Sequence, residues 1–95
     1  MQPSVYIVSN RMHGTLYVGV TSNISKRVWE HKEGVFEGFS KTHGTTRLVW
    51  YEFHGTMDAA ITREKQIKNW NRSWKIKLIE QENMEWSDLY ELLNI

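Results

Sequence analysis

The sequence predicts a small α+β domain, in which a three-stranded antiparallel sheet is flanked by helices in the order β-β-α-β-α-α-α. Three observations lead to this class. The 95 residues leave room for a single hydrophobic core. Three short runs are rich in β-branched and aromatic residues, as strands are, and four further segments indicate helices. Because no linker or repeat interrupts the chain, we expect one domain over residues 1–95.

The first two strands are expected at residues 4–8 and 15–20, which share the same β-branched and aromatic composition. The connection between them is polar, short and ends on a turn glycine, Gly14. Short connections of this kind join antiparallel neighbours, so the two segments predict a β-hairpin. Residues 46–53 repeat the strand composition and predict the third strand.

Four helices are expected, at residues 23–33, about 57–70, about 74–82 and about 85–93. Residues 21–23 are polar and can cap the first helix, and Gly34 can end it. Residues 34–45, between that helix and the third strand, show no apolar period and therefore predict a loop.

The net charge of +1 conceals an uneven distribution. All 12 basic residues lie in residues 1–79 with six acidic ones, whereas residues 80–95 hold five acidic residues and no basic one. This asymmetry indicates a polyanionic partner, such as nucleic acid, for the first part. We expect the acidic end to form a helical cap away from the nucleic-acid face.

The last helix would place Trp86, Tyr90 and Leu93 on one apolar stripe. Such a stripe either docks a protein partner or covers the domain's own core. We expect the second, because so short a chain needs the additional buried area.

The composition excludes several classes of protein. With 40% apolar and 24% charged residues the chain is not disordered, and the absence of cysteine excludes disulfides, thiol chemistry and cysteine-ligated zinc. The first residues lack the features of a signal peptide, and no apolar run approaches the roughly 20 residues that span a bilayer. We therefore expect a cytoplasmic protein with no membrane partner.

Glu64 is an acidic residue within an apolar helix face. At roughly 100° per residue it falls between Ala60 and Met57, close to Ile67. A buried carboxylate needs a partner. Either a core-side arginine or lysine forms a salt bridge with Glu64, or the carboxylate serves as a metal ligand or acid/base group in a cleft.

Arg27 and His31 form an i, i+4 pair at the edge of the buried face of the first helix. Two cationic groups at this spacing suit an anion such as phosphate, and the alternative is an arginine beside a neutral histidine. Across the predicted hairpin, period 2 places Tyr6 with Val8, and Tyr17 with Gly19. Gly19 weakens a strand, which indicates a close approach by a ligand or a packed helix.

These residues occur in an order that resembles the GIY-YIG nuclease family. Val5-Tyr6 and, after ten intervening residues, Tyr17-Val18-Gly19 resemble the family's two short motifs. Arg27 and His31 match its helix positions, ten and fourteen residues after Tyr17, and Glu64 matches its metal-binding glutamate. The resemblance covers roughly residues 4–79, and it is strongest to small stand-alone bacterial proteins of the superfamily.

The resemblance implies metal-dependent hydrolysis of phosphodiester bonds in DNA, in repair or recombination. It implies that Tyr17 is the general base, that Tyr6 orders the site, and that His31 hydrogen-bonds a tyrosine or the phosphate. Arg27 would bind the scissile phosphate, and Glu64 would hold Mg²⁺ or Mn²⁺. The basic residues expected to contact DNA are Arg27, Lys32, Lys41 and Lys68.

Two other functions remain open at this point. One is a non-catalytic nucleic-acid-binding module with the same fold, and the other is a protein-interaction domain. Selective cleavage by so small a domain would need a protein partner that supplies specificity. Four tryptophans could stack on bases, although their spacing favours packing: Trp29, Trp50, Trp70 and Trp74. Of these, Trp29 is expected to be exposed because it lies opposite Ile24 on its helix.

Overall fold

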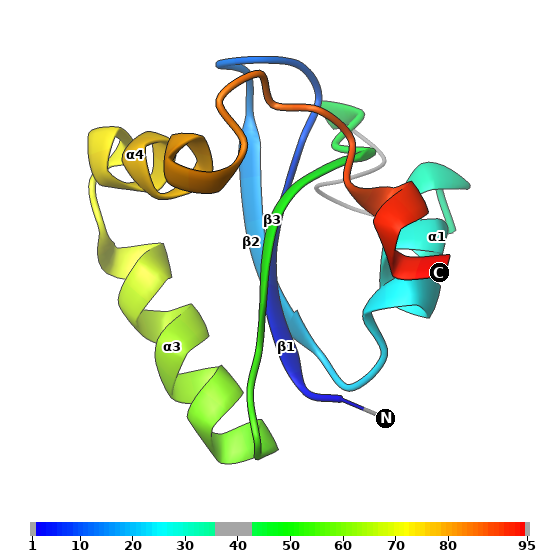
Figure 1. Cartoon of the computed structure of the whole chain (residues 1–95), viewed down its shortest axis with the longest axis vertical. Helices are drawn as coiled ribbons and strands as arrows, with labels where there is room; N and C mark the ends of the chain where they lie inside the picture. Colours follow the sequence, from blue (N-terminus) through cyan, green and yellow to red (C-terminus); the bar gives the residue numbers. More distant parts are fainter. Residues whose placement is uncertain (1, 36–42, 95) are drawn as a thin grey trace.

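The computed structural model describes residues 2–35 and 43–94 and has three layers. The middle layer is an antiparallel sheet of three strands in the order β2-β1-β3. The strands are β1 (Ser4–Ser9), β2 (Leu16–Thr21) and β3 (Arg47–Phe53). Figure 1 shows helices α3 and α4 on one side of this sheet, and α1 and the C-terminal segment on the other. The predicted α+β class is confirmed.

The central strand β1 separates two hydrophobic clusters. All six of its residues are buried, because both faces of the strand are covered. Val5 and Ile7 point into the cluster beneath α3 and α4, whereas Tyr6 and Val8 point into the cluster beneath α1. The expected period of two is therefore present, and it sends the Tyr6 phenol into the α1 layer.

The helices begin at polar caps, as their sequences indicate. Among the described residues, the α-helices with full bounds are α1 (Ile24–Lys32), α3 (Met57–Asn69) and α4 (Arg72–Glu82). The side chains of Asn23, Thr56 and Asn71 each accept a backbone N–H bond from the first turn of the helix that follows. Gly34 follows α1 with a φ of 66°, a left-handed conformation that glycine adopts without strain. Helix α4 begins two residues earlier than predicted, because Asn71 caps it.

The prediction of a helix over residues 85–93 is wrong in its first half. Only a short 3₁₀ helix, η1 (Tyr90–Asn94), is present. Asn83 ends α4 and its side-chain amide bonds both the N–H and the carbonyl of Ser87, at 3.0 and 2.9 Å. Trp86 then adopts a φ of 57°. These two local bonds turn the chain where a helix would have continued.

The C-terminal segment covers the domain's own core, as expected. Trp86 is fully buried in the cluster beneath α4, and its indole N–H donates to Glu80 at 2.7 Å. Leu89 donates its backbone N–H to Leu48 of β3 at 2.8 Å, so the segment also protects that sheet edge. The acidic end was expected to lie away from the nucleic-acid face; within it, η1 packs against α1.

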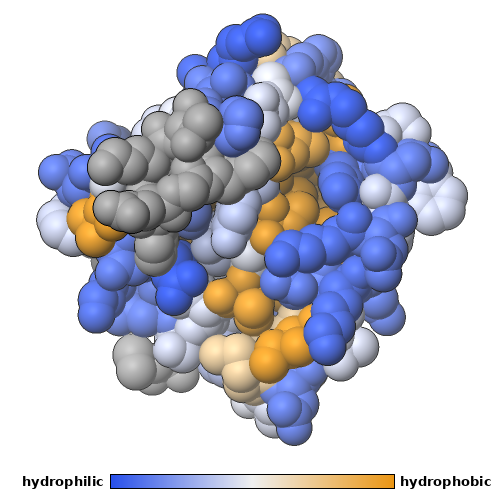
Figure 2. Space-filling view, turned by 180° about the vertical axis from the view of Figure 1, so that it is seen from behind, coloured by the Kyte–Doolittle hydropathy of each residue, from blue (hydrophilic) through white to orange (hydrophobic). Residues whose placement is uncertain are grey.

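The surface retains apolar area on the side that Figure 1 hides. Figure 2 shows an apolar strip down the middle of that side, with hydrophilic residues along both flanks. Trp29 is 48% exposed on α1, as its position on the helix predicts. In the described part of the chain, every helix is too short or too polar to span a bilayer.

Candidate active site

Tyr6, Tyr17 and Gly19 lie on one face of the hairpin. Tyr6 stands directly opposite Gly19 in the β1–β2 register. A Cβ atom on Gly19 would lie 2.8 Å from Cε1 of Tyr6, and closer still to its Cζ and hydroxyl oxygen. The absence of a side chain at Gly19 therefore leaves the space that the Tyr6 phenol occupies. The close approach that Gly19 allows is therefore that of Tyr6, its neighbour on β1, and not that of a ligand or a packed helix.

His31 closes this face from α1. Its ring lies 5.6 Å from the ring of Tyr6 and 5.3 Å from that of Tyr17, and the two phenol rings are 6.4 Å apart. A hydrogen bond of 3.0 Å joins the Tyr6 hydroxyl to Nε2 of His31. The histidine is only 3% exposed. We refer to Tyr6, Tyr17 and His31 as the aromatic cluster.

Burial sets the protonation state of two members of the cluster. Burial, and then the nearby charge of Arg27, lower the pKa of His31 to about 4, so the imidazole is neutral at neutral pH. Burial raises the pKa of Tyr6, and the nearby Tyr17 and Glu64 add to this shift. The charge of Arg27, and then a hydrogen bond from it to the phenol, act in the opposite direction. The Tyr6 hydroxyl therefore keeps its proton, and it can donate a hydrogen bond to Nε2 of the neutral His31.

Arg27 lies between the aromatic cluster and the surface. Its side chain is 36% exposed, and its Nε is 3.4 Å from Glu30. Beside it is a polar hollow of about 160 Å³, lined by Thr21, Ser22, Asn23, Lys26, Arg27 and Glu30. Glu30 was not among the predicted site residues, although its i, i+3 spacing from Arg27 indicates that the two side chains are neighbours on α1. The position of Arg27 allows an anion from solvent to reach the guanidinium.

Glu64 belongs to the other layer of the fold. It lies on α3 between the fully buried Ala60 and Ile67, as the helical wheel predicts, and its side chain is 13% exposed. Helix α3 packs against β2 and β1. The charge of Glu64 contributes to raising the pKa of Tyr6, so the carboxylate belongs to the electrostatic surroundings of the cluster. Its partner is the Lys68 ammonium at 3.1 Å, one turn further along α3.

A hard divalent cation fits the residues around Glu64. Within residues 2–35 and 43–94, no three His, Asp or Glu side chains gather in a manner that could hold a metal. A single carboxylate suits Mg²⁺ or Mn²⁺, since Mg²⁺ keeps several of its water ligands, whereas zinc sites need three or four protein ligands. The Lys68 side chain is half exposed, so its ammonium is free to swing away from the carboxylate.

Of the other basic residues expected to contact DNA, the two that the structure describes have acidic partners. Lys32 donates to the Thr46 carbonyl at 2.9 Å and forms an ion pair with Asp88. It therefore ties α1 to the C-terminal segment. Lys41 lies outside the described residues. Lys68 is the basic residue beside Glu64.

Comparison with known proteins identifies the family. Residues 2–77 match the model of the GIY-YIG catalytic domain. The chain belongs to this family. Its relatives include UPF0213 proteins of Staphylococcus saprophyticus, 35% identical over 81% of this chain and 93% of the relative, and of Clostridium perfringens, 30% identical over 85% and 87%. The predicted resemblance is confirmed.

A solved structure supports the same fold. The solution NMR structure of a UPF0213 protein from Bacillus halodurans superposes with a TM-score of 0.58 at 24% identity, covering 97% of each chain. GIY-YIG domains form a nuclease family. The function of the aromatic cluster is therefore considered below as that of a nuclease site. The UPF0213 names themselves specify no activity.

Proposed function

We propose that the protein is a divalent-metal-dependent endonuclease that hydrolyses phosphodiester bonds in DNA. One observation supports the proposal: two tyrosines and a neutral histidine lie together on one face of the hairpin with Arg27 beside them, and the charge of Glu64, on α3 in the second layer, acts on the pKa of Tyr6. Phosphodiester hydrolysis needs a base for water, a cation for the phosphate and a carboxylate for a hard metal ion.

Arg27 is the phosphate-binding group in this proposal. Its guanidinium donates to the Tyr6 hydroxyl and is partly exposed beside the polar hollow. A planar fork of donors can hold two phosphate oxygens and stabilise the charge that develops on them in the transition state. Glu30 competes for the same donors at 3.4 Å, so binding of a phosphate requires that this ion pair open.

The two tyrosines have different tasks. Tyr6 is fully buried and keeps its proton, so it orders the site by accepting from Arg27 and donating to His31. Tyr17 is partly exposed and therefore accessible to a water molecule, and it is our choice of general base. His31 holds the Tyr6 hydroxyl in place through Nε2.

Glu64 would hold Mg²⁺ or Mn²⁺ through a carboxylate oxygen. The ion, when bound, stabilises negative charge on the phosphate and leaving oxygens. Within the protein, Lys68 neutralises Glu64 until it is displaced.

A nicking assay on branched, nicked and flap DNA with Mg²⁺ or Mn²⁺ tests the proposal. Glu64→Gln and Arg27→Ala should each reduce the cleavage rate by about 10²–10³, the usual cost of losing an electrostatic group of the transition state. Glu82→Gln is the matched control, because Glu82 is an exposed carboxylate at the end of α4. Equal cleavage by wild type and Glu64→Gln would remove the assignment.

The second candidate is a nucleic-acid-binding module without catalysis. The ion pair with Lys68 favours it, because that pair satisfies the Glu64 carboxylate without any metal. Titration with Mn²⁺ separates the two functions. If DNA binds in a salt-dependent manner and Mn²⁺ leaves the NMR resonances around Glu64 unbroadened, binding alone is the better account.

A further inference from the structure

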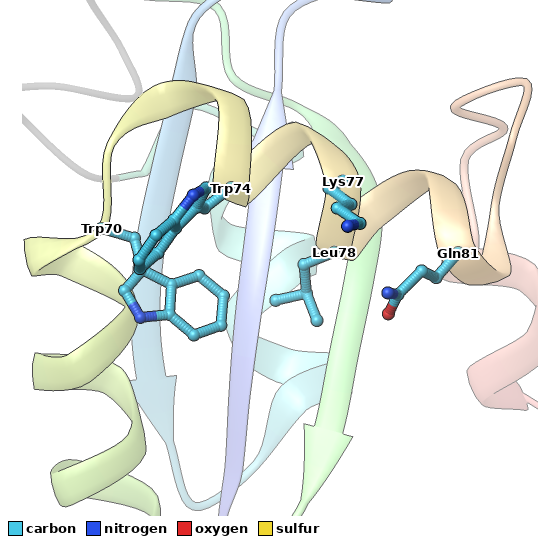
Figure 3. Close-up of a pocket in the computed structure, with 5 residues that line it drawn as sticks. All are labelled: Trp70, Trp74, Lys77, Leu78 and Gln81. Carbon is cyan, nitrogen blue, oxygen red and sulfur yellow. The ribbon is translucent and has the colours of Figure 1, made fainter.

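A second hollow lies on the α3–α4 layer, across the sheet from the aromatic cluster. It has a volume of about 270 Å³ and is lined by Trp70, Trp74, Lys77, Leu78 and Gln81. Figure 3 shows the two indoles side by side at the corner between α3 and α4, with Lys77, Leu78 and Gln81 following along α4. We call it the tryptophan hollow. None of its residues has a role in the site described above.

Its aromatic side chains are arranged as a stacking surface. Trp74 is 57% exposed, although an indole of this size is normally well covered in a folded domain. Its ring meets that of Trp70 edge to face, with centroids 6.0 Å apart at 78°. Trp70 is partly buried and carries the Arg63 guanidinium over its ring at 5.3 Å. Trp70 thus supports Trp74, and the Trp74 ring remains accessible to a ligand.

The charge of this layer favours a polyanion. From the start of α3 to the end of α4, residues 57–82 hold six basic residues and four acidic ones, a net charge of +2. Three of the basic residues have partners within the fold: Arg63 pairs with Glu52, Lys68 with Glu64, and Arg72 donates to backbone carbonyls. Among the described residues, the other three have no acidic partner at ion-pair distance: Lys65, Lys75 and Lys77.

Helical spacing aligns the polar groups with the indole. Trp74, Lys77 and Gln81 follow one another at i, i+3 and i+7, and so share one face of α4. A stacking ring, an ammonium and an amide in a row match the base, the phosphate and the base edge of a nucleotide.

We propose that the tryptophan hollow binds an unpaired strand of DNA, with a base stacked on Trp74 and a phosphate on Lys77. Unpaired bases are required because the faces of bases in a duplex are already stacked on one another. This inference rests on the proposed function where it treats the bound DNA as a substrate. The substrate would then be DNA with single-stranded segments, such as flaps. Glu64 lies on α3 and Trp70 is the C-cap residue of that helix, six residues further and roughly 9 Å along its axis, so one strand can reach both places.

A second copy of the chain fits the hollow less well. The adjoining hollow adds Ile76 and Met84 to the apolar area. However, Lys77 lines both hollows and has no acidic partner, and interface cores are depleted in lysine. A phosphate neutralises Lys77, whereas an apolar partner would bury its charge at a cost.

The test measures binding of the full chain to fluorescein-labelled oligo(dT) and to a duplex of equal length, by anisotropy in buffer containing EDTA. Trp74→Ala should raise the Kd for oligo(dT) roughly tenfold, change the duplex Kd much less, and be partly rescued in Trp74→Phe. Trp29→Ala is the matched control, since Trp29 is a similarly exposed indole on α1. Lys77→Gln should reduce the slope of log Kd against log salt by about 0.7, as for one phosphate contact.

Circular dichroism verifies that each variant is folded, which the exposure of Trp74 leads us to expect. An unchanged Kd in Trp74→Ala, or equal losses in Trp74→Ala and Trp29→Ala, would overturn the inference. So would sedimentation showing self-association that Trp74→Ala abolishes while oligo(dT) affinity stays the same. Because no metal is present, this outcome is independent of cleavage. An inactive protein can still bind through Trp74, and an active nuclease can still fail this test.

Discussion

Gly19→Ala tests whether the packing of the site requires a residue without a side chain. The added Cβ would lie 2.8 Å from Cε1 of Tyr6 and closer to Cζ and the hydroxyl, and the Tyr6 ring is fully buried. Overpacking of this kind costs about 1–3 kcal/mol, against a gain of about 0.5–1 kcal/mol for replacing glycine in a strand. We expect a net loss of about 1–2 kcal/mol in the free energy of unfolding. For a domain of this size the loss lowers Tm by about 5–15 °C.

Urea unfolding of Gly19→Ala beside Gly55→Ala measures this loss. Gly55 is the control because a Cβ there would meet no atom within 4 Å, so it reports only the backbone gain. The hydrogen bond between Tyr6 and His31 should also lengthen, with a shift of the imidazole resonances and a slower nicking rate. If Gly19→Ala is as stable as Gly55→Ala and its imidazole resonances are unchanged, the steric reasoning is wrong.

Two further predictions concern buried side chains. His31 has a pKa lowered to about 4 by burial and by Arg27, so the unfolded chain binds its proton first as the pH falls below about 6.5. The free energy of unfolding should therefore fall by about 2 kcal/mol between pH 7.5 and pH 5 because of His31. Urea unfolding of the wild type at the two pH values should show this loss. The same comparison with His31→Gln should not show it, because glutamine does not titrate. Trp86→Ala should cost about 3–5 kcal/mol or prevent folding, because the indole is fully buried, whereas Trp29→Ala should change stability by less than about 0.5 kcal/mol. Similar urea midpoints for these two tryptophan variants would show that the C-terminal segment is dispensable for the core.

The sequence predicted those elements whose signals are local. The strands were recognisable from β-branched and aromatic runs, and the start of α1 from the polar residues that cap it. Period 2 in β1 correctly separated Val5 and Ile7 from Tyr6 and Val8. In each case the physical cause acts within a few residues, so composition and spacing contain it.

The C-terminal segment could not be predicted in this way. Its apolar spacing indicated a helix, but long-range bonds determine its path: Asp88 accepts from Leu48 at 3.2 Å, and Asn83 donates to Val49 at 3.1 Å. Both partners lie on β3, at least 34 residues away along the chain. No local pattern reports such partners, and tertiary bonds of this kind override helical propensity.

For the candidate site, the sequence predicted its members through the family resemblance but not their electrostatics. The roles that we propose for the two tyrosines rest on their different burial, which depends on three elements at once. Tyr6 is enclosed because β1 is central, because Gly19 leaves space on β2, and because α1 places His31 over it. Burial raises the pKa of Tyr6, so this phenol serves as a hydrogen-bond donor at neutral pH and is unsuited to accept a proton from water. Tyr17 lies on the edge strand and is partly exposed, so water can reach this phenol, and this is why the proposed function assigns the general base to Tyr17.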